Sequence, residues 1–267
     1  MTDWDDAYAN MAHITGGDAL PDRWMADAAA YRASGVWIEE HAYGADEREL
    51  FDLVWPDGTP KGIAVFVHGG YWIQTDKSFW TDLAEGARAS GWAVCLPQYT
   101  LAPDARIAQI TQQIGRAITV AAQMVAGPIR LAGHSAGGHL VARMMCDDTP
   151  LFPDLNARVD HCLSISGLHD LRPLMRTKMN AKLQLDPPEA ARESAALRTP
   201  HPRANITAWV GGGERPEFIR QARMLPLMWA GFDVTARLVL DGEHDHFSLL
   251  DGLKDKDSAI TNAFVGV

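Results

Sequence analysis

One short segment constrains the fold of this chain more than any other. It is Gly133-His134-Ser135-Ala136-Gly137, which fits the pattern Gly-x-Ser-x-Gly. The segment follows the apolar, strand-like run Ile129–Ala132 and precedes the helix-like run Gly138–Ala142. A serine on a sharp turn between a strand and a helix needs small neighbours, because side chains at the glycines would collide with the adjoining backbone. The pattern therefore predicts Ser135 as a nucleophile; for the pentapeptide alone, the alternative is an ordinary glycine-rich turn.

A second feature lies upstream, where an apolar β-type run stops abruptly at His68-Gly69-Gly70. Acyl transfer through a serine produces an oxyanion, which backbone N–H groups fixed in advance can stabilise. Glycines directly after a strand expose such groups, and the residue after the nucleophile supplies another. We therefore expect the amides of Gly69, Gly70 and Ala136 to form an oxyanion hole.

A carboxylate should follow the serine in the chain, and a histidine should follow the carboxylate. The apolar run Asn205–Val210 is typical of a buried strand and leads through three glycines to Glu214. The carboxyl end of a strand is where open α/β sheets build their sites, so Glu214 is the predicted acid. Glu217 and Asp170 are the alternatives. Pro216 at a first helical position makes Glu217 a first-turn residue, whose charge simply favours the helix dipole.

Two histidines are candidates for the base. His244 and His246 lie two positions apart after the last strand-like run, Val234–Leu240, and either could reach Ser135 from that loop. Residue spacing alone does not separate them. The acidic neighbours of these histidines also suggest a metal site, but the segment lacks the spaced ligands from elsewhere that zinc would need. We expect no metal and no cofactor.

Together these segments carry a family resemblance. The chain resembles the hormone-sensitive-lipase-related side of the α/β-hydrolase superfamily, and within it most closely the kynurenine formamidases (arylformamidases). The resemblance covers most of the chain after about residue 45. The matching segments, in order, are His68-Gly-Gly-Tyr71-Trp72, Gly133-His-Ser-Ala-Gly-Gly-His139, Ser166-Gly-Leu-His-Asp-Leu171 and Glu214-Arg-Pro-Glu-Phe218.

The resemblance implies an α/β-hydrolase fold with about eight strands in a mostly parallel sheet, helices on both faces and a small cap. It also separates the two histidines, because the base of the family lies in an Asp-His-Phe segment, which selects His246 over His244. The family's acid carries over onto Glu214, although this chain has Glu and Arg where Asp and Ser are commoner.

The activity implied by the resemblance is that of a serine hydrolase that cleaves a small acyl group through an acyl-enzyme, here the formyl group of N-formylkynurenine. Tyr71 and Trp72, beside the oxyanion loop, are the expected substrate-binding residues. A general carboxylesterase for short-chain esters would use the same residues. A non-catalytic binding protein of this fold is a remote alternative, because such proteins commonly lose a triad member, whereas this chain has a candidate for each of the three. The expected partner is a small ester or formamide.

Composition limits the setting and the partners. The chain has 267 residues and 47% hydrophobic content, which suit one α/β-hydrolase domain over residues 1–267. The formal charge of −10, without a dense Lys/Arg cluster, argues against a nucleic-acid surface. Cys95, Cys146 and Cys162 have no metal-type spacing and predict reduced core thiols. No apolar run reaches membrane-spanning length and no leader pattern is visible, so we expect a cytoplasmic protein. The sequence allows a homodimer without indicating one.

Strand-like and helix-like runs alternate along the chain, which predicts a mostly parallel sheet covered on both faces. The first two strands, joined without a helix, are expected to be antiparallel. The predicted strands are Val36–Glu40, Leu50–Trp55, Ile63–Val67, Trp92–Pro97, Ile129–Ala132, Val159–Ile165, Ile206–Val210 and Val234–Leu240.

Two segments lie outside this alternation. Residues 1–35 carry aromatic side chains at loosely helical spacing, and we expect helices that pack on the body rather than line the site, with a lid as the alternative. Residues 171–200 replace a simple crossover by short helices broken at Pro187-Pro188. For this segment a small cap over the site is favoured over a structural excursion at the sheet edge.

Overall fold

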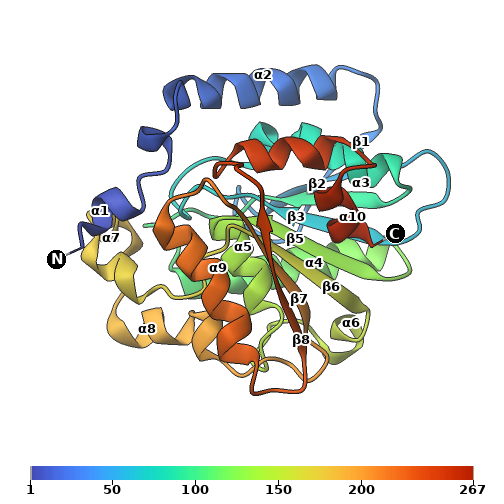
Figure 1. The fold of residues 1–267 in the computed structure, drawn as a ribbon. Coiled ribbons are helices and arrows are strands. Elements are labelled where there is room, and N and C mark those ends of the chain that lie inside the picture. The colour runs from blue at the N-terminus through green and yellow to red at the C-terminus, as the bar shows by residue number, and fades with distance from the viewer. Residues whose placement is uncertain (1, 267) are drawn as a thin grey trace.

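Eight strands form one sheet in the computed structural model, which describes residues 2–266 (Figure 1). The strand order is β1-β2-β4-β3-β5-β6-β7-β8. The strands are β1 (Ile38–Ala42), β2 (Leu50–Val54), β3 (Ile63–Val67), β4 (Ala93–Pro97), β5 (Ile129–His134), β6 (Val159–Ile165), β7 (Asn205–Gly211) and β8 (Thr235–Asp241). Each strand overlaps the run predicted for it, so the predicted fold class is confirmed.

The pairing of the strands fixes where a site can form. β1 pairs antiparallel with β2, as predicted, and β2 pairs antiparallel with β4. All the pairs from β4 through β3 to β8 are parallel. Because the carboxyl ends of parallel strands meet at one edge, the loops after β3, β5, β7 and β8 come together there.

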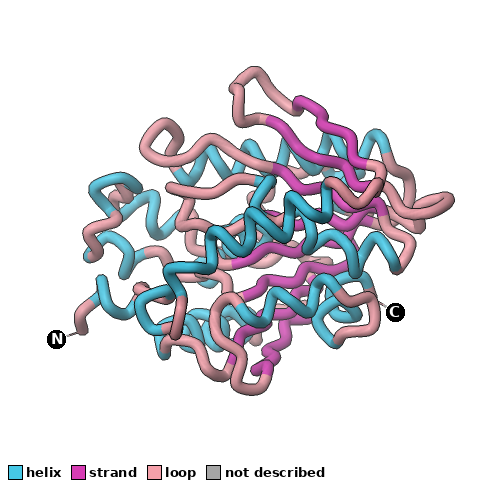
Figure 2. The backbone as a smooth tube through the Cα atoms, turned by 90° about the horizontal axis from the view of Figure 1, so that it is seen from above, coloured by secondary structure: helices cyan, strands magenta, loops and turns pink. Residues whose placement is uncertain are grey.

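Helices cover both faces of the sheet, because the buried strands present apolar side chains to both sides (Figures 1 and 2). In β3, Ile63 and Val65 belong to one apolar cluster, whereas Ala64 and Phe66 belong to the other. The first cluster includes side chains of α4, α5 and α9, and the second includes side chains of α2, α3 and α10. The α-helices are α1 (Trp4–Ala7), α2 (Leu20–Arg32), α3 (Glu85–Ala89), α4 (Ile107–Met124), α5 (Ala136–Arg143), α6 (Pro153–Asn156), α7 (Asn180–Leu183), α8 (Pro187–Arg192), α9 (Pro216–Trp229) and α10 (Ala259–Val265). The 3-10 helices are η1 (Met11–His13), η2 (Gly17–Ala19), η3 (Lys77–Phe79), η4 (Thr81–Ala84), η5 (Arg172–Arg176), η6 (Ala195–Leu197) and η7 (Ser248–Lys254).

The N-terminal segment spans the molecule before the sheet begins. In Figure 1 it runs from α1, next to the yellow segment that contains α7, to α2 on the opposite side of the domain. The backbone N–H of Lys178 donates to Asp5 Oδ1 at 2.7 Å, which ties α1 to that yellow segment. The expectation that the segment packs without lining the site is wrong, because Tyr8 to Ala12 and Trp24 line the same cavity as Ser135.

Residues 171–200 do not form the predicted cap over the site. The apolar side chains of Leu174, Leu183 and Leu185 are buried in the cluster on the α4, α5 and α9 face of the sheet. No residue between 171 and 200 lines the cavity that contains Ser135. The physical cause is that these leucines bury their side chains in that apolar cluster, so the segment packs against the body of the domain.

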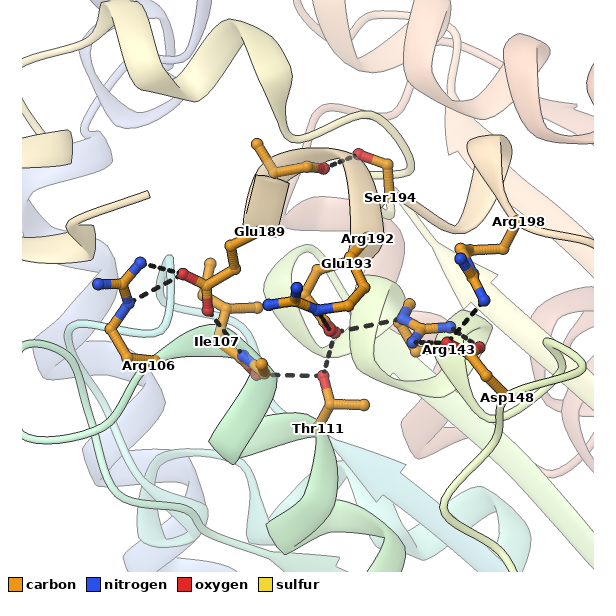
Figure 3. Close-up of polar contacts among 12 residues, drawn as sticks. Arg106, Ile107, Thr111, Arg143, Asp148, Glu189, Arg192, Glu193, Ser194 and Arg198 are labelled. Carbon is orange, nitrogen blue, oxygen red and sulfur yellow. Dashed lines mark hydrogen bonds and ion pairs between the residues drawn. The ribbon is translucent and has the colours of Figure 1, made fainter. Parts of the chain in front are cut away.

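A buried polar network fastens the end of this segment to α4 and α5 (Figure 3). The carboxylate of Glu193 accepts hydrogen bonds from Thr111 Oγ1 at 2.9 Å and from Arg143 Nε at 3.2 Å. Arg143 also donates to both carboxylate oxygens of Asp148, at 2.8 and 3.1 Å. His139 Nε2 donates to the carbonyl oxygen of Glu193 at 2.7 Å, because a carbonyl oxygen can only accept. Burial lowers the pKa of His139 to about 3, so the ring is neutral. The network therefore holds α5 at His139 and at its last residue, Arg143.

Other expectations from composition concern cysteines and membrane segments. Cys95, Cys146 and Cys162 are buried and free, as predicted. Within residues 2–266, none of the helices combines the length and the apolar character that crossing a bilayer requires.

Removing Arg143 should destabilise the fold far more than removing its exposed neighbour Arg192. The side chains of Arg143 and Glu193 are only 3% and 5% exposed, so Arg143→Met leaves a buried carboxylate without its cation, at a cost of about 3–5 kcal/mol. Arg192 is 54% exposed and lies 3.9 Å from the same carboxylate, so Arg192→Met should cost at most about 1 kcal/mol. Urea unfolding of both variants measures the difference. Equal midpoints would contradict the anchoring role of Arg143.

Candidate active site

Ser135 occupies the turn between β5 and α5 in a strained backbone conformation. Its φ is 55° and its ψ is −114°, a region that costs a non-glycine residue about 1–3 kcal/mol. Close packing holds the turn in place. A Cβ on Gly133 would collide with the carbonyl of Gly137, and a Cβ on Gly137 would collide with the carbonyl of Val67. The N–H of Ser135 donates to the carbonyl of Ile165 at 2.8 Å, so the sheet itself fixes the serine.

Glu214 and His246 form a buried hydrogen-bonded pair at the same edge of the sheet. Nδ1 of His246, in the loop after β8, donates to Oε2 of Glu214, just after β7, at 2.7 Å. The other carboxylate oxygen of Glu214 accepts hydrogen bonds from Ser166 Oγ at 2.5 Å and from the N–H of Gly211 at 2.9 Å. The two side chains are 3% and 0% exposed. A bond at Nδ1 orients the imidazole and leaves Nε2 to exchange a proton.

The other residues considered for the acid and the base do not take part in this pair. Glu217 is in the first turn of α9, as predicted, but it is buried and accepts a hydrogen bond from Tyr8 OH at 2.8 Å, so the helix dipole is not its whole role. Asp170 is paired with Arg172 Nε at 2.8 Å. His244 is exposed, in contrast to His246. The geometry brings only Glu214 and His246 together.

His134, the variable residue of the pentapeptide, supports the loop that carries His246. Burial, together with the neighbouring ring of His246, holds the pKa of His134 well below its usual range, so this ring is neutral. Its Nε2 donates to the carbonyl oxygen of His246 at 2.8 Å. The ring of Phe218 lies 4.4 Å from that of His246, measured between centroids, and the ring of His134 lies 4.5 Å away. His246 is thus held by both its backbone and its ring.

The amides predicted for an oxyanion hole are available. Within residues 2–266, the N–H groups of Gly69, Gly70 and Ala136 donate to no protein acceptor. Gly70 has φ 106° and closes a tight turn in which its carbonyl accepts from the amides of Ile73 and Gln74. A side chain on Gly70 would collide with the carbonyl of Gln74, so the turn requires glycine.

A cavity of about 270 Å³ opens onto Ser135 and His246. Its lining combines aromatic and other apolar residues with several polar side chains. The lining residues are Tyr8, Ala9, Asn10, Met11, Ala12, Trp24, Gly70, Tyr71, Gln74, Thr75, Trp80, His134, Ser135, His246 and Phe247. Such a volume lies at the lower end for small-molecule sites, so the cavity suits a compact substrate.

The two residues expected to bind substrate differ in position. Tyr71 lines the cavity, and its hydroxyl donates to the carbonyl oxygen of Tyr8 at 2.5 Å. Trp72 is fully buried, does not line the cavity and packs its ring against the edge of His139 at 5.1 Å. The expectation for Trp72 is therefore corrected to a packing role, because its side chain lies in the apolar cluster on the α4, α5 and α9 face of the sheet.

The sequence did not predict several residues that contribute to the site. Ser166 donates to the acid, His134 supports the base, and Tyr8, Asn10 and Trp24 form a wall of the cavity. Ser166 and His134 lie inside the matched segments, so their neighbourhood was visible but their hydrogen bonds were not. The wall comes from the chain's first residues, and no local pattern links them to a site far along the sequence.

The sheet and the serine turn define a hydrolase. The chain belongs to the α/β-hydrolase fold family, whose model matches residues 64–238. This confirms the resemblance predicted from the sequence.

Similarity to individual proteins narrows the comparison within this family. A Danio rerio protein named kynurenine formamidase is 28% identical over 230 residues, which cover 82% of this chain and 78% of the relative. A Drosophila melanogaster protein of the same name is 24% identical, with 85% and 80% covered. A crystal structure from Silicibacter sp. TM1040, described provisionally as a thioesterase, is 45% identical over 100% of both chains with a TM-score of 0.95. Esterase B from Lactobacillus rhamnosis shares the fold, with a TM-score of 0.68, 17% identity and 93% of both chains covered.

His246→Ala should lower kcat/KM by about a thousandfold or more, whereas His244→Ala should change it by less than about tenfold. Only His246 is hydrogen-bonded to Glu214 and lines the cavity, and His244 is exposed. Steady-state kinetics on a chromogenic aryl ester measure both variants, with circular dichroism as the control for folding. A greater loss in the His244 variant would reverse the choice of base.

Glu214→Gln should lower kcat by up to about ten-thousandfold with little change in KM, because the amide lacks the charge that stabilises the imidazolium and orients its tautomer. Asp170→Asn is the comparator, since Asp170 is also buried but is paired with arginine rather than histidine. It should keep kcat within about tenfold of the parent. The same rates measured on both variants test the prediction, and a collapse confined to Asp170→Asn would mean that the acid has been misplaced.

Proposed function

We propose that this hydrolase removes a formyl group from an aromatic amine, as an arylformamidase does, through an acyl-enzyme on Ser135. The observation that carries the proposal is the buried hydrogen bond between Glu214 and His246. His246 and Ser135 line the same small aromatic cavity. N-formylkynurenine is the proposed substrate.

In the first half of the proposed reaction, His246 takes the proton from Ser135 as the hydroxyl oxygen attacks the formyl carbon. Glu214 keeps the imidazole in the tautomer that accepts at Nε2 and stabilises the imidazolium that forms. The oxyanion lies against the free amides of the Gly69-Gly70 loop and Ala136.

Collapse of the tetrahedral intermediate breaks the bond between carbon and nitrogen. The protonated His246 gives its proton to the nitrogen, so the aryl amine leaves neutral and Ser135 carries the formyl group. Water then enters, His246 removes one of its protons, and formate leaves as the serine is restored. Each proton lost by an attacking oxygen is returned by the same imidazole.

The choice of substrate rests on the cavity and on the relatives. A formyl group needs almost no space on the acyl side, and Tyr8, Tyr71, Trp24 and Trp80 supply aromatic surface for the leaving group. The relatives named kynurenine formamidase match over about four fifths of this chain, with 82% covered in one and 85% in another.

A second candidate is an esterase or thioesterase acting on a short acyl group. It is supported by the Silicibacter protein, whose sequence is 45% identical over its full length and which is described provisionally as a thioesterase. Esters and thioesters would react through the same serine, because their leaving groups are better than an amine and require no different machinery. We do not retain the non-catalytic alternative, since the chain belongs to a family of hydrolases.

The cellular setting follows as a further part of the proposal. The buried free cysteines Cys95, Cys146 and Cys162 support a reducing compartment, consistent with the expected cytoplasmic location. A homodimer stays a prediction that size-exclusion chromatography with light scattering would test.

Ser135→Ala should remove nearly all turnover, by as much as about a millionfold, because the nucleophile is lost while the oxyanion amides stay. The parent should cleave N-formylkynurenine with a higher kcat/KM than p-nitrophenyl acetate, p-nitrophenyl butyrate or an acetyl thioester. Absorbance assays on these four substrates compare the candidate functions. Activity of Ser135→Ala close to the parent would exclude the serine mechanism, and a parent that cleaves only esters or thioesters would exclude the formamidase proposal.

A further inference from the structure

Asn10 lines the active-site cavity and carries a buried side-chain acceptor that no group among residues 2–266 satisfies. The residue is 5% exposed and lines the cavity together with Ser135 and His246. Its Nδ2 lies 3.4 Å from the hydroxyl oxygen of Tyr71, and its Oδ1 is buried without a hydrogen-bond partner among residues 2–266. Buried polar atoms in native proteins are nearly always paired, so an unpaired oxygen on a residue that lines a binding cavity points to a ligand donor.

The orientation of the Asn10 amide follows from its neighbour. Tyr71 OH donates its hydrogen to the carbonyl oxygen of Tyr8 at 2.5 Å, so towards Asn10 the phenolic oxygen can only accept. Burial, with a contribution from the Glu214 carboxylate, raises the pKa of Tyr71, so the phenol keeps this hydrogen. Nδ2 of Asn10 must therefore face Tyr71, and Oδ1 is the atom left over.

The backbone around Asn10 makes its position firm. Its N–H donates to the carbonyl of Tyr8 at 3.1 Å, and its carbonyl accepts from the N–H of His13 at 3.0 Å. Tyr8 is in turn fixed by its hydroxyl, which donates to Glu217 at 2.8 Å. Asn10 is thus held against the residue that follows the oxyanion loop, on the same cavity as the nucleophile.

We propose that Asn10 Oδ1 accepts a hydrogen bond from the N–H of the scissile amide, and that Asn10 thereby makes the site selective for N–H formamides over esters. This role rests on the proposed function and deepens it. The proposed ligand chemistry is a secondary aryl amide, whose N–H supplies a donor for this oxygen, whereas the oxygen of an ester leaving group supplies none.

The mechanism explains why such an acceptor matters. In the tetrahedral intermediate, the lone pair of the nitrogen must face His246 to receive its proton. The hydrogen already on that nitrogen then points away from His246, into the lining, where an unpaired acceptor would hold it. As the C–N bond breaks, the nitrogen keeps that hydrogen, gains the one from His246 and leaves as a neutral aryl amine. An ester oxygen carries no hydrogen and gains nothing from the acceptor.

Trp80 offers an internal comparison. Its Nε1 is also buried without a partner among residues 2–266 and its side chain also lines the cavity, but an indole nitrogen only donates. It cannot accept from a substrate N–H. The matched control for Asn10 is Asn262→Leu, the same substitution at an exposed asparagine of α10 that does not line the cavity.

The test compares formanilide, phenyl formate and N-methylformanilide, which share the formyl and phenyl groups but present N–H, O and N–CH₃ at the scissile bond. Asn10→Leu keeps the size of the side chain and removes the acceptor, whereas Asn10→Asp keeps an acceptor oxygen. Asn10→Leu should lower the ratio of kcat/KM for formanilide to that for phenyl formate about tenfold or more, the range of a lost hydrogen bond. Asn10→Asp should restore most of the ratio, and Asn262→Leu should leave it unchanged.

N-methylformanilide supplies the final arm of the test. Because it has no N–H, the parent and Asn10→Leu should cleave it with similar kcat/KM. An unchanged ratio in Asn10→Leu, or an equal loss on all three substrates, overturns the role of Asn10 while leaving the formamidase proposal standing. A parent enzyme that cleaves phenyl formate but neither formanilide nor N-formylkynurenine overturns both.

Discussion

The rest of the site depends on the close backbone packing between the turn that carries Ser135 and the strand beside it. Gly137 lies so near the carbonyls of Val67 and His68 that no side chain fits, and Gly133 lies equally near the backbone of the following turn. This packing lets α5 begin directly against the centre of the sheet, and it forces Ser135 into its positive φ. The strain is tolerated because β3, β5 and β6 surround it. Everything else at the site is arranged around this fixed point.

Glu214 and His246, the proposed acid and base, reach that point from distant parts of the chain, and their burial has consequences. Removing a carboxylate from water is unfavourable unless several donors replace the solvent. Glu214 has such donors, since it accepts from His246, Ser166 and the N–H of Gly211. The same arrangement leaves the carboxylate no freedom to turn, so the imidazole ring has one orientation. The hydrogen bond from His134 to the backbone of His246 fixes the loop as well, and couples the base to the turn that carries the serine.

The sequence predicted well those features that depend on local pattern. Apolar runs located every strand of the sheet, and the glycines around Ser135 located the turn, because close backbone approach tolerates no other residue there. Features that depend on long-range packing were not visible. Trp72 looked like a binding residue by its place in the chain, but its side chain is buried in the core, whereas that of its neighbour Tyr71 lines the cavity. The leucines of residues 171–200 have the same pattern whether they cover a site or a helix face, and only the neighbouring helices decide between the two.

The N-terminal segment illustrates how such long-range packing creates a site. Asp6 contacts Arg215, the residue directly after the acid, and the pKa of Asp6 is lowered chiefly by its hydrogen bond with His13. Tyr8 binds Glu217 and is contacted by Gln221, both on the helix that follows the acid. The first residues of the chain are therefore bound to the same short stretch that positions Glu214. Because one stretch contacts the wall of the cavity and adjoins Glu214, the proposed catalytic carboxylate, a displacement of that wall would also displace Glu214. Under the proposed function, substrate selection and catalysis therefore depend on the same stretch.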